Sequence, residues 1–368
     1  MTPQGLRRAP KVREVRRTGL LRPCGVLAVP LIVALEPDVI MSLPASLRSR
    51  LTLPAICAPM FRVTGPALVR EACKAGVIGG LPRHNARGRE EAEAWLRDIR
   101  EHLDAHSAKH PDARIGPLAV NVTGKLSPDE LKAELELCRR YRVEIIISAM
   151  GDPTEIIQRT HDWGGLVFHD VTNLRFAEKA VRAGADGLTC IGAGGGGNSG
   201  TISHLALIPK VRSLFDGVVI MAGAISTGAA IRAGEILGAD LAYLGTRFIA
   251  TQESDAPQAY KELLVSEGAA DLTYTPHITG VPCNWLSRSL RESGLDPANL
   301  PRPTGGIYRR DHLPPGVKPW SNMWSAGQGI DLIDDVPTVC DLVGRLRNEY
   351  VAACRLPDMS EEARRPPP

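Results

Sequence analysis

The strongest constraint on the fold of this chain is a rhythm that begins near residue 53 and repeats eight times. Each repeat is a short apolar run, a glycine or polar turn, and an amphipathic stretch. Short strands that alternate with helical patterns are typical of βα units and a parallel sheet. The runs are AICAPM, GVIGG, LAVNV, EIIISAM, LVFHDV, GLTCIGA, VVIMAGA and LAYLGT. Because eight such units close a barrel, we predict an α/β fold of the (β/α)8 TIM-barrel class.

Helical patterns fill the spaces between these runs, for example at residues 65–76, 127–141, 173–184 and 227–238. Several end in glycine, which is typical of a helix C-terminus. The string SPDE at residues 127–130 combines a serine cap, a proline in the first turn and two acids, which predicts a helix start there.

The part of the chain that follows the eighth run differs in composition. A further helical region covers residues 246–271, and proline and glycine become frequent between Pro276 and Pro319. We interpret this part as a lid inserted after strand eight. The expected organisation is therefore a barrel core at 41–260, a lid insertion with a C-terminal helix at 261–355, and a disordered tail at 356–368.

The first forty residues are predicted to be a disordered or artefactual leader. They carry seven Lys and Arg residues, followed by an apolar run that Pro30 interrupts. Because no small-residue cleavage site follows this run, the segment does not have the pattern of a signal peptide. Met41 stands just before the first predicted core segment and is the start that we expect. The intact mass of the protein from its own host tests this.

Composition and charge exclude several classes of protein. Of the 368 residues, 43% are hydrophobic and 23% charged, which excludes a disordered or fibrous chain. Outside the leader the charge is near neutral, so no nucleic-acid partner is expected. No run reaches the roughly 20 apolar residues of a membrane span, so no membrane partner is expected. Eight cysteines without a C-x-x-C pair predict reduced thiols and a cytoplasmic location, and no metal site is predicted.

Glycine-bearing turns follow the last three predicted strands. They are GAGGGGNSG after strand six, AGAISTG after strand seven and LGTRF after strand eight. In a barrel, phosphate commonly binds at this end, where free N–H groups and helix dipoles favour an anion. Ordinary tight turns also need glycine, but three such turns at consecutive strand ends favour phosphate. Gly223, Gly245 and Thr246 are the best candidate contacts.

A dinucleotide-binding fingerprint offers another interpretation of the glycines. A G-x-G-x-x-G trace runs from Gly192 through Gly194 to Gly197. That fingerprint normally follows the first strand of its unit and needs an acid about 20 residues later. Here it follows the sixth strand, so we discount it.

The ends of earlier strands offer a surface for a heterocycle. Ala58, Pro59 and Met60 end the first run, and Asn121 lies in the third. An amide both donates and accepts hydrogen bonds, which suits the edge of a ring, although Asn121 could instead stabilise a turn.

Several motifs together resemble the FMN-dependent nitronate monooxygenases, a family that also includes enoyl-ACP reductases and NADH:quinone reductases. These motifs include PAICAPM, LAVNV, AGADGLTCIGAGGGGNSGT, MAGAISTGAAIRAGEILGADLAYLGTRFIAT and WSAGQGIDLIDDVPT, between about Leu53 and Ala353. The resemblance implies that FMN is held at the C-terminal mouth of the barrel. The implied cofactor-binding residues are Ala58, Pro59, Met60, Asn121, Asp170, Gly196, Gly197, Ala222, Gly223, Ala224, Gly245 and Thr246.

Three positions depart from the family pattern. Ala224 stands where a glycine is usual, a change that backbone N–H contacts should survive. Asn198 stands where the catalytic histidine of the family usually follows the glycine pair. His204 lies six residues further on and could replace that histidine or have a purely structural role. Asp170 stands where many members have lysine, after the retained His169. The candidate catalytic residues are therefore His169, as acid or base, and Asn198.

The missing histidine affects the predicted reaction. A neutral nitroalkane must lose a carbon-bound proton, which Asn198 cannot accept. A nitronate anion needs no such step, and Asn198 could donate a hydrogen bond to it. The resemblance therefore implies oxidation of alkyl nitronates with O2. NAD(P)H-dependent reduction of an enoyl thioester or quinone, and a non-catalytic protein that binds a flavin or another phosphate ligand, stay open. The expected partner is a small-molecule substrate, and a homodimer is left open.

Overall fold

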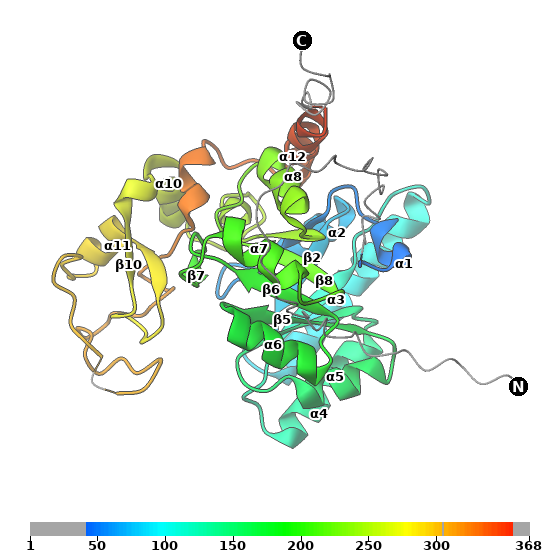
Figure 1. Cartoon of the computed structure of the whole chain (residues 1–368), viewed down its shortest axis with the longest axis horizontal. Coiled ribbons are helices and arrows are strands. Elements are labelled where there is room, and N and C mark those ends of the chain that lie inside the picture. Colours follow the sequence, from blue (N-terminus) through cyan, green and yellow to red (C-terminus); the bar gives the residue numbers. More distant parts are fainter. Residues whose placement is uncertain (1–41, 304, 356–368) are drawn as a thin grey trace, which may run out of the picture.

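A closed barrel of eight parallel strands forms the centre of the structure, a computed structural model that describes residues 42–303 and 305–355 (Figure 1). The expected leader, the Met41 start and the expected tail lie outside the described residues. Pairing of β1 with β9, through Ala55 and Ala242, closes the ring. The strands are β1 (Ala55–Cys57), β2 (Ile78–Pro82), β3 (Leu118–Thr123), β4 (Ile145–Ala149), β5 (Leu166–Val171), β6 (Gly187–Ile191), β8 (Val218–Ala222) and β9 (Leu241–Leu244). The predicted fold class is confirmed.

Eight helices surround the barrel. They are α2 (Pro66–Lys74), α3 (Arg89–Lys109), α4 (Pro128–Arg140), α5 (Thr154–His161), α6 (Leu174–Ala183), α7 (His204–Arg212), α8 (Gly228–Leu237) and α12 (Val339–Ala353). The last of these packs against α8 and α2, so the C-terminal helix completes the helical layer. Ser127 forms the capping box predicted for α4. Gly184 and Gly238 end α6 and α8 in the left-handed conformation.

Side chains alternate between two cores along each strand. Ile147, Phe168 and Ile220 belong to a cluster inside the barrel, whereas Ile146 and Val167 belong to the cluster between the strands and the helices. This alternation follows from the two-residue period of a strand. Which side of the sheet a side chain occupies therefore decides whether it can reach the barrel mouth.

Acidic residues tie neighbouring strands together at the opposite, N-terminal end of the barrel. Glu144, Asp186 and Asp240 each precede a strand and accept the backbone N–H of the neighbouring strand's first or second residue. Asp240 also pairs with Arg212, and Glu144 with Arg50. Features at this end of a barrel serve stability, whereas chemistry takes place at the other end.

The chain between β9 and α12 forms a smaller unit beside the barrel (Figure 1). It contains α9 (Thr246–Ile249), α10 (Gln258–Ser266), the antiparallel pair β10 (Leu272–Thr275) and β11 (Cys283–Leu286), and α11 (Ser287–Glu292). Two-residue β7 (Gly197–Asn198) touches β11. The remaining short elements are α1 (Ala45–Arg48), η1 (Arg83–Asn85), η2 (Ala269–Asp271) and η3 (Gln328–Leu332). The domain boundaries stay a prediction.

Candidate functional site

A cavity of about 510 Å³ lies at the C-terminal ends of the barrel strands. Strand ends, the loops that follow them and the segment after β9 all contribute walls. A concave site of this size, mostly apolar with a few polar groups, suits a small organic ligand. The predicted site residues that line it are Ala58, Pro59, Met60, Asn121, Asp170, Gly196, Gly197, Asn198, Ala222, Gly223, Ala224, Gly245 and Thr246.

The glycine run after β6 allows three loops to approach one another closely. A Cβ on Gly223 would lie 2.7 Å from the backbone nitrogen of Gly195, and a Cβ on Gly196 would lie 2.8 Å from that of Gly327. The Gly327 N–H in turn donates to the Thr246 hydroxyl at 2.9 Å. Part of the conformational freedom of these glycines therefore serves backbone-to-backbone packing around the cavity.

Unused backbone donors remain in the two closing loops. Within the described residues, the N–H groups of Ala224, Ile225 and Thr246 have no hydrogen-bond partner. All three residues line the cavity. Donors of this kind are the groups that bind a phosphate in other barrels.

Ala224 occupies a backbone conformation that favours glycine. Its φ is +57°, in the left-handed region, which costs an alanine roughly 1–2 kcal/mol. We expect Ala224→Gly to raise the free energy of unfolding by about 0.5–1 kcal/mol, because the added flexibility of the unfolded chain offsets part of the relief. Urea denaturation of the variant and the parent checks this. An unchanged or lower stability would show that the strain is absent.

Strained backbone concentrates around the same cavity. Six non-glycine residues in the described part of the chain have a positive φ, and four of them line the cavity. These four are Met150, Ala224, Tyr308 and Trp320. Strain of this kind persists where the surrounding structure enforces it and clusters at functional sites.

The floor of the cavity carries three inward-facing polar side chains, Asn121 on β3, Asp170 on β5 and Tyr243 on β9. The Nδ2 atom of Asn121 donates to the Ile147 carbonyl at 3.0 Å. The side-chain oxygen of Asn121 therefore remains available to another partner. The Asp170 Oδ1 atom is buried and has no partner among the described residues. Burial raises the pKa of Asp170 to about 7, and the hydroxyl of Thr189 on β6 offsets part of that rise. Burial and the Asp170 charge also raise the pKa of Tyr243.

The structure does not bring His169 to the cavity. Phe168 and Asp170, its neighbours in β5, point into the barrel, so His169 faces the helices. Its Nδ1 atom lies 2.7 Å from the Ser148 hydroxyl, and burial lowers its pKa to about 4. The geometry therefore gives no support to the predicted acid or base role, and Asp170 is the titratable group of β5 that faces the ligand space.

Asn198 does line the cavity, and a tyrosine orients it. Its Nδ2 atom donates to the Tyr308 hydroxyl at 2.7 Å, while its Oδ1 atom is buried without a partner in the described part of the chain. One amide hydrogen is thus left for a ligand. The Nε2 atom of His204 lies 2.7 Å from the Ala222 carbonyl, beside the start of α7, so His204 has the structural role.

Several of the residues that line the cavity were not predicted from the sequence. Tyr243 and His84 lie at the ends of strands, so the rule that barrel chemistry sits at strand ends could have found them. Tyr308 and Arg310 come from the proline- and glycine-rich segment and Trp320 directly follows it, where no periodic pattern indicates which side chains turn inward.

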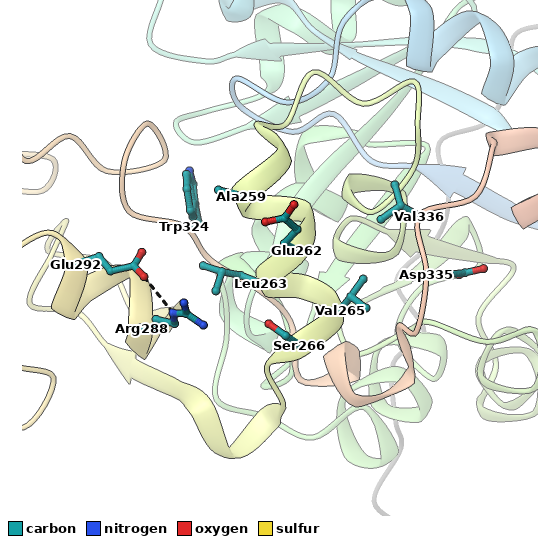
Figure 2. A pocket seen from close by; sticks show the side chains of 10 residues that line it. All are labelled: Ala259, Glu262, Leu263, Val265, Ser266, Arg288, Glu292, Trp324, Asp335 and Val336. Atoms are coloured by element: carbon teal, nitrogen blue, oxygen red, sulfur yellow. Dashed lines mark hydrogen bonds and ion pairs between the residues drawn. The ribbon is translucent and has the colours of Figure 1, made fainter.

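A second cavity, of about 580 Å³, lies in the segment after β9 (Figure 2). It is lined mainly by α10 and by Arg288 and Glu292 of α11. Arg288 is already paired with Glu292 and Glu267. The strand ends that carry chemistry in barrels face the first cavity, so we assign function there.

Known proteins resemble this chain over most of its described length. A (3aS,4S,5R,7aS)-5-hydroxy-7a-methyl-1-oxo-octahydro-1H-indene-4-carboxyl-CoA dehydrogenase from Rhodococcus jostii is 28% identical over 240 residues, which is 65% of this chain and 64% of the relative. The match thus spans less than two thirds of that protein. A nitronate monooxygenase from Paraburkholderia phytofirmans is 27% identical, over 66% of this chain and 76% of the relative.

Structural similarity agrees with these matches. A nitroalkane oxidase from Streptomyces ansochromogenes superposes with a TM-score of 0.66 and 25% identity, over 84% of this chain and 99% of that one. The family model described as nitronate monooxygenase matches residues 49–349. Together with the barrel and its mouth cavity, this match shows that the chain belongs to the nitronate monooxygenase family of oxidoreductases.

Proposed function

We propose that this chain binds FMN in the barrel-mouth cavity and oxidises alkyl nitronates with O2. Members of the family generally depend on a flavin. The observation that carries the proposal is that unused backbone donors and a polar floor face one cavity, in a chain of this family.

The polar groups that line the cavity match the hydrogen-bonding groups of FMN. The free N–H groups of Ala224, Ile225 and Thr246 would hold the phosphate. The amide of Asn121 and the carboxyl of Asp170 would meet the hydrogen-bonding edge of the ring system. Bound FMN would supply the electron transfer that side chains cannot provide.

The protein groups around the remaining space bind and orient the substrate. The free amide hydrogen of Asn198 suits a nitro oxygen, and Tyr308 fixes the direction of that amide. Phe61 and Trp320 pack edge to face with ring centroids 6.3 Å apart and line the cavity. These aromatic walls limit the access of water to the substrate.

Anaerobic mixing of the flavin-loaded protein with propionate 3-nitronate tests the proposed reaction. We expect the nitronate to bleach the flavin absorbance and O2 to restore it, whereas NADH and NADPH bleach it slowly or not at all. Bleaching by NAD(P)H but not by the nitronate would contradict the proposal and support a reductase. A bound flavin that neither reagent bleaches would support the non-catalytic binding protein.

One observation favours chemistry on a thioester as the second candidate. The Rhodococcus jostii relative is named as a dehydrogenase of a carboxyl-CoA compound. Arg310, which lines the cavity and is exposed, could meet an anionic part of such a substrate. Bleaching of the flavin by NAD(P)H, followed by reoxidation with an enoyl thioester, distinguishes this candidate.

We propose a cytoplasmic location and a small-molecule substrate as the partner. Five of the cysteines in the described residues are buried and free, as in a reducing compartment. Among those residues, no helix is long and apolar enough to cross a bilayer. A homodimer stays a prediction that sedimentation would test.

A further inference from the structure

A histidine from the turn after β2 lines the same cavity as Asn198. His84 is the middle residue of η1, directly after β2, and it is the only histidine among the described residues that line the cavity. Its ring stacks on Phe61, with centroids 5.2 Å apart and planes inclined by 30°.

Both chain neighbours of His84 are anchored. The Arg83 guanidinium makes two hydrogen bonds to Glu134 on α4. The Asn85 amide donates to the carbonyls of Met60 and Thr64 at 3.0 and 2.9 Å, and its oxygen accepts the Arg62 N–H at 2.9 Å. The turn is therefore fixed on both sides of His84.

The ring nitrogens of His84, by contrast, are unused. No hydrogen-bond partner for either nitrogen occurs in the described part of the chain, whereas the rings of His169 and His204 each contact one. Burial, and then the Arg83 charge, lower the pKa of His84 below its ordinary value. The lowered pKa favours the neutral ring, which has a lone pair available, and this is the state that a general base requires.

We propose that His84 is the catalytic base that lets this chain use neutral nitroalkanes as well as nitronates. This inference rests on the proposed function. The substrate Cα–H bond breaks, the proton forms an N–H bond on the His84 ring, and the electron pair stays on the substrate as the nitronate. The free amide hydrogen of Asn198 stabilises the charge on the nitro oxygens. The nitronate then enters the proposed oxidation, and the imidazolium returns its proton to water.

The test compares two substrates in three flavin-loaded proteins: the parent, His84→Gln, and the control His102→Gln. His102 is exposed on α3, and its ring contacts Asp98 on the same helix. For nitroethane, we expect His84→Gln to lower kcat/KM by about 10²–10⁴-fold, with a primary deuterium isotope effect in the parent. For ethyl nitronate, which needs no proton removal, kcat/KM should fall far less, so the ratio of the two kcat/KM values separates a lost base from a general change in the cavity. His102→Gln should match the parent throughout.

A further variant separates catalysis from misfolding. In His84→Ala, added imidazole should restore nitroethane turnover, because the small base occupies the space of the lost ring. If the parent oxidises ethyl nitronate but not nitroethane, or if His84→Gln retains nitroethane turnover, the inference is wrong and the proposed function stands. If the parent oxidises no nitronate, the proposed function fails and the inference fails with it.

Discussion

Replacing Asp170 by asparagine is expected to raise the free energy of unfolding of the apoprotein by about 2–4 kcal/mol at pH 8. Burial raises the folded-state pKa of Asp170 to about 7, from about 3.9 in an unfolded chain. Between these values the folded state binds more protons, so ionisation of Asp170 lowers stability as the pH rises from about 4 to about 7. Asparagine keeps the shape and cannot ionise.

The gain should shrink toward zero near pH 4, where the carboxyl is neutral in the folded state. Urea denaturation at several pH values measures it, with Asp112→Asn as the control. Asp112 is exposed on a loop, and its replacement should change stability by less than about 0.5 kcal/mol at any pH. A gain for Asp170→Asn that does not depend on pH would show that burial does not act on this carboxyl.

Gly223→Ala is expected to weaken FMN binding by roughly tenfold or more and to lower the free energy of unfolding by about 1–3 kcal/mol. The φ of Gly223 is +112°, and an added Cβ would lie 2.7 Å from the Gly195 nitrogen and 2.9 Å from the Gly195 Cα. The methyl group would push apart the two loops on which the proposed phosphate site depends.

Gly344→Ala is the matched control for this variant. Gly344 lies in α12, and a Cβ there has no neighbour within 4 Å. The same chemical change should raise stability by about 0.5–1 kcal/mol and leave FMN binding unaltered. Equal FMN affinity in the Gly223→Ala and Gly344→Ala proteins would contradict the assignment of the phosphate loops.

Most of the barrel was predictable because each strand and helix has a local signal. LVFHDV became β5 with its predicted bounds, and SPDE became the capped start of α4. The glycine-bearing turns after the last strands line the cavity as expected, because parallel strands bring all their C-terminal ends to one side.

The side on which a strand residue lies was harder to predict. In LVFHDV, five of the six residues are buried, so hydrophobicity does not reveal which alternate positions face the barrel interior. The family resemblance predicts His169 at the site, whereas the place of its neighbour Phe168 in the interior cluster puts His169 on the helix side. A buried parallel strand lacks the polar face that would indicate this choice.

The segment after β9 was predictable only as an insertion. Tyr308 and Trp320 reach the cavity through left-handed backbone conformations in irregular structure. These conformations depend on contacts with distant residues, such as the Asn198 amide on Tyr308. No local pattern in the sequence encodes contacts of that kind.

Titration of the apoprotein with FMN tests whether the barrel-mouth cavity is a flavin site. We expect saturation at one FMN per chain, with a shifted flavin absorbance spectrum and quenched FMN fluorescence, and weaker binding by Gly223→Ala than by Gly344→Ala. A colourless protein that leaves FMN absorbance and fluorescence unchanged at every concentration would contradict the proposed cofactor and the reaction that depends on it.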